Sequence, residues 1–264
     1  MKRLVLFRFH QNRAVCQNRL DLIRRYNPAV EIHGLYGGDE SIYPKVEQAI
    51  GSEFSSLFCL KGKTPLWKWL HGDLAVRDWY QAVGRTLSFD VVHLAEWDLV
   101  LLDSLDNIYK HVPADAAGIT GLVKLELIKD RWCWTRRSSW WTAQFERLLA
   151  YMRRKYLYDG EPYASQGPGL CLPRQFLELY AAAEIPPLCH DEVRLPLFLQ
   201  SFGINLFDTG LYNGWFDGAD EAFFNCRNQE IESEVIWDEL GCPGGVRAFH
   251  PYRQTFNHER RAAS

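Results

Sequence analysis

The sequence lacks the short motifs that identify several common classes of protein. Its cysteines occur singly, without a Cys-x-x-Cys pair, so we expect free thiols in a reducing compartment and no zinc site or redox pair; they are Cys16, Cys59, Cys133, Cys171, Cys189, Cys226 and Cys242. Phosphate-binding Gly-x-x-x-x-Gly-Lys, dinucleotide-binding Gly-x-Gly-x-x-Gly, Gly-x-Ser-x-Gly and His-Glu-x-x-His are all missing. These absences argue against P-loop kinases, nicotinamide enzymes, serine hydrolases and zinc peptidases.

An excess of charge and long apolar runs are missing as well. The chain has 30 basic and 33 acidic residues and a formal net charge of -3, too little positive charge to bind nucleic acid or anionic membranes through phosphates. No segment approaches the roughly 20 apolar residues of a membrane span. The first apolar run is interrupted by Arg8 and His10 and has no signal-peptide cleavage site. We therefore expect a cytoplasmic protein whose partners include neither nucleic acid nor a membrane.

The order of the apolar runs predicts an α/β protein, with residues 1–264 forming a single domain. Residues 4–9 predict a buried strand, residues 14–26 a helix, and residues 30–36 a second strand. This spacing implies a right-handed crossover between parallel strands. We therefore expect a mostly parallel central sheet with helices on both faces, whose ligands lie beyond the carboxyl ends of the strands.

Three later segments bear on the site. Residues 67–87 predict one helix, with Trp69 in its apolar stripe, and residues 138–158 predict another, with Trp140 turned inward. Residues 167–174 predict a glycine-rich turn that leads into a helix.

Two carboxylates, Glu96 and Asp98, flank Trp97 directly after an apolar run. Alternate residues of an extended chain point to the same side, so both could bind one Mg²⁺ or Mn²⁺ that also holds a diphosphate. Such a metal would neutralise the leaving diphosphate. The alternative is a solvated turn, since acid-x-acid triplets are frequent by chance. The position after a buried strand favours the site, because a charge there needs a partner.

A second acidic pair, Asp191 and Glu192, follows His190 at the predicted start of a helix. A carboxylate at this place could take the proton of an acceptor hydroxyl, as a general base does. Asp191 could equally be the N-cap and Glu192 a first-turn acid that stabilises the helix. Both interpretations stay open for Asp191, whereas we favour catalysis for Glu192.

His250 is a candidate third metal ligand through its neutral imidazole, although a single histidine is more often structural. The 10 tryptophans also have two interpretations, which are compatible. Most of them can fill the core, while a few line a carbohydrate groove, because an aromatic face packs well on the C–H face of a sugar ring.

Taken in order, these segments resemble the GT-A glycosyltransferases of the nucleotide-diphospho-sugar transferase superfamily. The resemblance covers nearly the whole chain and rests on FRFHQNR, YGGD, EWD, GPGLCLPR, HDEVRLP and the late His250. It implies a mixed, Rossmann-like sheet, a nucleotide diphosphate sugar as donor, and Mn²⁺ or Mg²⁺ held by Glu96, Asp98 and His250.

The resemblance also assigns the other contacts. The donor would be contacted by Arg8, His10, Asn12, Gly37, Gly38, Asp39, Glu96 and Trp97. The glycine-rich segment with Gly169 would face the donor or acceptor sugar, and Asp191 or Glu192 would be the base of an inverting displacement. Glutamate stands first in EWD, where the family usually has aspartate, and some relatives with a single acid there work without metal. Metal dependence therefore stays open.

We thus predict an enzyme that transfers a hexosyl-type group from a nucleotide diphosphate sugar to a hydroxyl of a glycan or small acceptor. A uridine-linked donor and inversion are the favoured alternatives. One rival is a nucleotidyltransferase, but it would be expected to have a glycine-rich basic loop after the first strand, and FRFHQNR has no glycine. The other is a non-catalytic carbohydrate- or nucleotide-sugar-binding protein of the same fold, which the many tryptophans permit.

Overall fold

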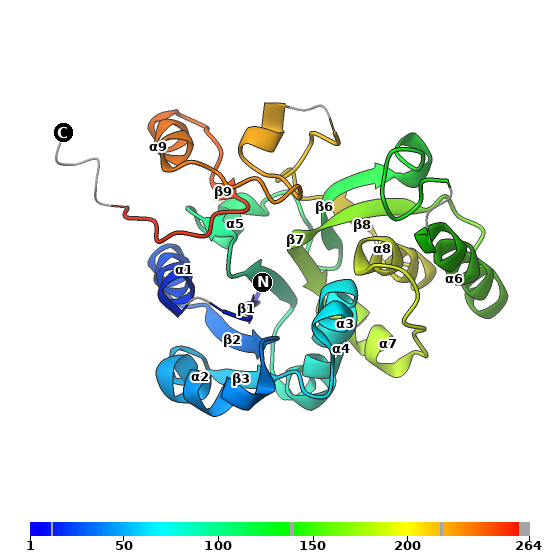
Figure 1. The fold of residues 1–264 in the computed structure, drawn as a ribbon, viewed down its shortest axis with the longest axis horizontal. Coiled ribbons are helices and arrows are strands. Elements are labelled where there is room, and N and C mark those ends of the chain that lie inside the picture. The colour runs from blue at the N-terminus through cyan, green and yellow to red at the C-terminus, as the bar shows by residue number, and fades with distance from the viewer. Residues whose placement is uncertain (12, 138–139, 217–218, 259–264) are drawn as a thin grey trace.

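In residues 1–11, 13–137, 140–216 and 219–258, which the computed structural model describes, a seven-stranded sheet carries helices on both faces (Figure 1). Its order is β3-β2-β1-β4-β7-β6-β8, and only β7 runs opposite to the others. The strands are β1 (Arg3–Phe9), β2 (Glu31–Tyr36), β3 (Ser56–Cys59), β4 (Val91–Glu96), β6 (Ala117–Lys124), β7 (Tyr163–Pro173) and β8 (Leu206–Asp208). The predicted mixed, mostly parallel sheet is confirmed.

A smaller sheet pairs β5 (Val100–Leu101) with β9 (Ala248–Phe249) in antiparallel fashion. The helices are α1 (Arg13–Tyr26), α2 (Tyr43–Ile50), α3 (Pro65–Leu70), α4 (Gly72–Ala82), α5 (Leu105–Ile108), α6 (Trp140–Tyr156), α7 (Arg174–Ala182), α8 (Asp191–Ser201) and α9 (Ser233–Gly241). In the described part of the chain, no helix has both the length and the apolar character needed to cross a bilayer.

Alternation along β1 sends its side chains into two separate cores. Leu4 and Leu6 pack with apolar residues of α4, α7 and α8 on one face of the sheet. Val5 and Phe7 pack with residues of α1 on the other face. The period of two residues in a strand that is buried on both sides therefore explains why the whole run is apolar.

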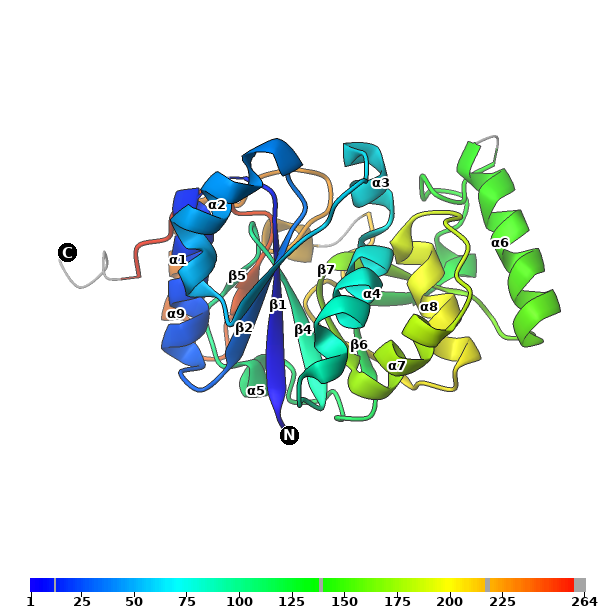
Figure 2. The same cartoon turned by 90° about the horizontal axis from the view of Figure 1, so that it is seen from below.

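The carboxyl ends of β1, β2 and β4 meet at one edge of the sheet, toward which β1 runs upward in Figure 2. The parallel register places Arg8 opposite Glu96. Because β7 is antiparallel to β4, with Cys171 opposite His93, the residues that precede Cys171 lead toward the same edge. Segments far apart in sequence thus deliver polar groups to one place, as expected for an open α/β sheet.

The prediction of a single helix for residues 67–87 is wrong, because the helix is interrupted at His71. Its backbone there (φ -132°, ψ 46°) is not helical, and it separates α3 from α4. A short 3-10 helix follows at Gly84–Thr86. Trp69 therefore does not join the predicted apolar stripe, and the Trp69 side chain is 59% exposed.

Two further sequence predictions need correction. Residues 167–173 lie in strand β7 and not in a turn, since the positive φ of Gly169 (76°) lets the strand bulge without ending. Trp140 is 71% exposed and does not face the core. It lies at the beginning of α6, and residues 138–139 of the predicted helix are outside the described residues.

Candidate functional site

Arg8 is the central cation of the carboxyl edge. Its Nη2 forms an ion pair with Glu96 Oε1, and both side chains are mostly buried. Burial lowers the pKa of Arg8, but the carboxylates of Glu96 and Asp191 outweigh it and the pKa is raised. The guanidinium is therefore a permanent positive charge between two acids, one from β4 and one from α8.

The chain turns sharply after Glu96, so the condition under which Glu96 and Asp98 would share a side, an extended chain, is not met. The N–H of Leu99 donates to the carbonyl of Glu96 at 3.0 Å, which closes a tight turn around Trp97 and Asp98. Glu96 consequently faces Arg8, whereas Asp98 lies 3.6 Å from His250 Nε2 and 3.6 Å from Arg253 Nε. Trp97 is buried in the core, with the ring of His10 edge-on against it.

His250 is oriented as a histidine ligand of a metal commonly is. Its Nδ1 lies 2.8 Å from the carbonyl oxygen of Asn225, which leaves Nε2 directed toward Asp98. Burial lowers the pKa of His250, but the hydrogen bond and charge of Asp98 outweigh it and raise the pKa. The imidazole and the carboxylate of Asp98 thus lie 3.6 Å apart.

The chemistry of this pair fits a divalent ion, with an imidazole nitrogen and a carboxylate oxygen on adjacent elements. Glu96 differs, because Arg8 occupies its Oε1. Among the described residues, no group of three or more His, Cys, Asp and Glu side chains is arranged to hold a metal. Asp98 and His250 would therefore supply two protein ligands, and the remaining ligands would come from a bound diphosphate and water.

Asp191 and Glu192 begin helix α8, but Asp191 is not its cap. The N-cap position belongs to His190, whose backbone is extended (φ -74°, ψ 154°), and Asp191 is the first helical residue. The carboxyl of Asp191 is nearly buried, 2.9 Å from His190 Nδ1. Burial raises its pKa, but His190 and Arg8 outweigh this and the pKa is lowered, so Asp191 is a carboxylate.

Glu192 has the opposite electrostatic character. Its Oε2 accepts a hydrogen bond from Trp134 Nε1 at 2.8 Å, and its Oε1 accepts one from the N–H of Gly167 at 3.2 Å. Burial raises the pKa of Glu192 more than His190 lowers it, and the neighbouring Asp191 raises it further. A carboxyl with a raised pKa, held in position by two donors, takes up a proton more readily than an ordinary glutamate, so Glu192 is a candidate general base.

Trp134 is the site residue that the sequence did not indicate. Its indole stacks on the imidazole of His190 with centroids 4.3 Å apart and an angle of 9° between planes. The ring of Trp69 lies 5.5 Å from Trp134 and 5.4 Å from His190. The sequence WCW offered no periodicity or motif that could have linked Trp134 to Glu192.

The predicted nucleotide-binding loops lie at the same edge, beyond β1 and β2. Gly37 donates its N–H to the carbonyl of Phe9 at 2.8 Å, and the carbonyl of Gly38 accepts from Lys68 Nζ at 2.8 Å. Asp39 caps a short 3-10 helix, with Oδ1 accepting from the N–H of Ser41 at 2.9 Å.

The remaining residues predicted to contact the donor or acceptor are His10, Gly169 and Asn12. His10 is exposed to solvent on one side and lies against Trp97 on the other; this partial loss of solvent lowers its pKa, although Asp98 and Glu96 act in the opposite direction. Gly169 is buried, its carbonyl oxygen accepting from Tyr109 Oη at 3.0 Å, so Gly167 and not Gly169 faces Glu192. Asn12 lies outside the described residues.

A buried ion pair joins the helices beneath the site. Arg194 of α8 donates Nε to Asp73 Oδ2 at 2.8 Å and also contacts Oδ1 through Nη2; both side chains are essentially inaccessible. Tyr180 donates its hydroxyl to the same carboxylate. Next to Asp73, a Cβ on Gly72 would come within 2.6 Å of Asp191 Oδ2 and 2.7 Å of Arg8 Nη1. The pair thus fixes α4 and α8 directly behind the charged edge.

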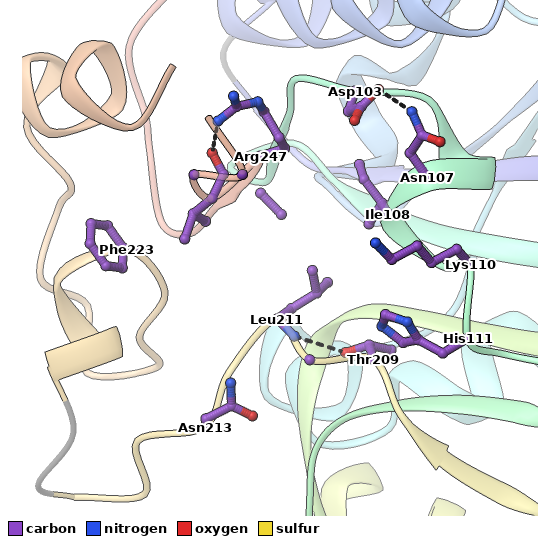
Figure 3. Close-up of a pocket in the computed structure, with 15 residues that line it drawn as sticks. Asp103, Asn107, Ile108, Lys110, His111, Thr209, Leu211, Asn213, Phe223 and Arg247 are labelled. Atoms are coloured by element: carbon purple, nitrogen blue, oxygen red, sulfur yellow. Dashed lines mark hydrogen bonds between the residues drawn. The ribbon is translucent and has the colours of Figure 1, made fainter. Parts of the chain in front are cut away.

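A cavity of about 520 Å³ lies apart from these carboxylates. Figure 3 shows that it is surrounded by side chains such as Asn107, Lys110 and Arg247, with Leu211 and Asn213 from the segment after β8. Arg247 donates hydrogen bonds to the carbonyl oxygens of Glu239 and Val246, at 2.7 and 2.9 Å, and so stabilises the backbone around it. This cavity and the edge that holds Glu96, Asp191 and Glu192 are thus different places.

No family model and no curated protein matches this sequence. Solved structures do resemble the chain. A mannosyltransferase from Pyrobaculum calidifontis, in complex with GDP-Man and Mn²⁺, is 12% identical with a TM-score of 0.43, over 78% of this chain and 54% of that one. The galactosyltransferase LgtC, in complex with donor and acceptor sugar analogs, is 12% identical with a TM-score of 0.37, over 69% and 60%.

A third similar structure is 4-diphosphocytidyl-2C-methyl-D-erythritol synthase, 13% identical with a TM-score of 0.47, over 88% of this chain and 94% of that one. The chain spans about half the length of the mannosyltransferase and 60% of LgtC. These similarities concern the arrangement of the chain, and no activity follows from them.

Proposed function

We propose that this protein transfers a sugar from a nucleotide diphosphate sugar to a hydroxyl of an acceptor, at the edge where β1 and β4 end and α8 begins. The observation that supports this most is the convergence there of a mostly buried cation and three acids, of which Asp191 has a lowered pKa and Glu192 a raised one. Arg8 lies between Glu96 and Asp191, and Glu192, with its raised pKa, follows directly. A diphosphate leaving group needs the cation, and an acceptor hydroxyl needs the base.

The donor would lie along the ends of β1 and β2. Arg8 has guanidinium N–H groups beyond the one that contacts Glu96, and these would donate to diphosphate oxygens. The loops with His10 and with Gly37 to Asp39 would contact the nucleoside, for which uridine is our first choice. Asp98 and His250 would hold Mn²⁺ or Mg²⁺, which would offset the negative charge of the diphosphate.

Glu192 would act as the base of an inverting displacement. The acceptor oxygen forms the new bond to the anomeric carbon while its proton passes to the Glu192 carboxylate. The bond from that carbon to the diphosphate oxygen breaks, and its electron pair leaves with the diphosphate. Trp134 and Gly167, which donate to the two oxygens of Glu192, would hold the carboxylate in position.

Thermal melting with UDP, GDP, CDP and their sugar conjugates, with and without Mn²⁺, tests the donor site. At a ligand concentration 100 times Kd, binding to the folded state adds about 2.7 kcal/mol, which for a chain of this size raises the Tm by roughly 5 °C. We expect a metal-dependent shift with one nucleotide, lost in Asp98→Asn. Asp159→Asn, the same change on an exposed residue between α6 and β7, should keep the shift.

A Tm that no nucleotide moves would overturn the proposal. Where a nucleotide does bind, release of nucleoside diphosphate from the matching sugar conjugate distinguishes a transferase from a binding protein. Glu192→Gln should retain the melting shift and lose turnover. Normal turnover in this variant would leave Glu192 only the role of stabilising the helix.

A further inference from the structure

Trp69 is an exposed aromatic side chain beside the proposed base. Its side chain is 59% exposed although its ring contacts Trp134 and His190. It lies on α3, which Figure 2 places near the edge toward which β1 runs. Its indole is thus the exposed member of an aromatic cluster at the rim of a polar site, a place where aromatic side chains commonly line ligand sites.

The local structure holds this ring in place. Helix α3 begins with Pro65 after Thr64, whose Oγ1 accepts from the N–H of Trp67 at 3.2 Å. His71 ends the helix, and its backbone N–H donates to the carbonyl of Trp67 at 3.0 Å. Because both ends of this short helix are fixed, the indole is presented to a ligand with little loss of conformational entropy on binding.

The contacts of Trp69 lead directly to the proposed base. Its ring packs on Trp134, and Trp134 donates to Glu192 Oε2 at 2.8 Å. One indole ring therefore separates Trp69 from the carboxylate that we propose as the base, so a ligand that lies on Trp69 is a neighbour of the reacting groups.

We propose that Trp69 is the stacking platform of an acceptor subsite, and that the acceptor is a carbohydrate whose pyranose ring packs its C–H face on the indole. This inference rests on the proposed function and makes the acceptor class more specific. The acids next to the platform, Asp191 and Glu192, have carboxyl oxygens that can accept hydrogen bonds from the hydroxyl groups of a ligand. A sugar combines an apolar face for the indole with hydroxyl groups for the acids.

Tryptophan fluorescence tests the platform without any nucleotide. The probes are the methyl glycosides of glucose, galactose and mannose, with lactose and cellobiose as disaccharides. We expect saturable quenching by at least one of them, weakened about tenfold in Trp69→Ala and partly restored in Trp69→Phe. Trp140→Ala is the matched control, since Trp140 is also exposed but lies on the outer helix α6, and it should bind the sugar as the unchanged protein does.

The outcomes separate the two proposals. Sugar binding that depends on Trp69, in a protein to which no nucleotide binds, supports the platform and overturns the transferase. The platform alone is overturned if the protein binds a nucleotide but Trp69→Ala leaves both the sugar affinity and the KM for the acceptor unchanged. Equal loss in the Trp69 and Trp140 variants, or no quenching by any probe, also overturns it. Unchanged Tm values of the variants check that each one is folded.

Discussion

Replacing Asp73 with alanine should destabilise the protein strongly, because it leaves the guanidinium of Arg194 buried without its partner. Arg194 and Asp73 have side-chain exposures of 0% and 1%, and the contact is bidentate. Burial lowers the pKa of Arg194, and in the intact protein Asp73 outweighs it and the pKa is raised. When the acid is lost, the guanidinium stays charged because it is too strongly basic to be deprotonated in a protein.

The expected cost follows from this burial. Removing one member of a buried ion pair typically costs about 3–5 kcal/mol, a large part of the roughly 5–15 kcal/mol by which a folded domain exceeds its unfolded state. For a chain of this length, that corresponds to a fall in Tm of roughly 5–9 °C. Urea unfolding of Asp73→Ala, followed by circular dichroism and by fluorescence, measures the loss and shows whether unfolding is still cooperative.

Two further variants make the test specific. Glu126→Ala removes one member of an exposed pair, with Lys129 at 2.7 Å, and should cost no more than about 1 kcal/mol. In Asp73→Leu with Arg194→Met, neither charge remains buried, so the double variant should be more stable than the sum of the single losses predicts. A loss below about 1 kcal/mol in Asp73→Ala, or strictly additive losses in the double variant, would refute the reasoning.

Three other predictions concern the proposed site. Gly38→Ala should destabilise the protein and weaken nucleotide binding, because a Cβ would lie 2.6 Å from the carbonyl oxygen of His10. Gly37→Ala should be tolerated, since the nearest atom to its Cβ would be 3.9 Å away. Equal Tm values of the two variants would contradict this. The acid limb of kcat/KM should titrate above the usual glutamate pKa, since burial raises the pKa of Glu192 and the base works only when deprotonated; a limb that is unchanged in a residually active Glu192→Gln would assign it to another group. His250→Ala should abolish the Mn²⁺-dependent part of a nucleotide melting shift and leave the metal-free part, and retention of both parts would exclude His250 as a ligand.

Local pattern in the sequence was sufficient for the elements that build the edge. The strands that end before His10, Gly37 and Trp97 follow from short apolar runs that meet polar residues, and the start of α8 follows from the acidic residues of its first turn. Where one residue decides the local geometry, pattern failed. His71 breaks the predicted helix at 67–87, and a positive φ lets Gly169 remain within a strand.

Which groups pair at the edge was decided by the tertiary structure alone. Arg8 meets Glu96, 88 residues later, only because β1 and β4 are parallel in that register. Trp134 reaches Glu192 across 58 residues, and Arg194 reaches Asp73 across 121. The physical reason is that periodicity records which side of a strand or helix is buried, whereas a pairing partner depends on register and on how helices pack over the sheet. The apolar runs and the acidic residues therefore located the main strands along the chain and the candidate acids. Tertiary packing decided that Glu96 pairs with Arg8, that Asp98 lies beside His250, and that Glu192 accepts a hydrogen bond from Trp134.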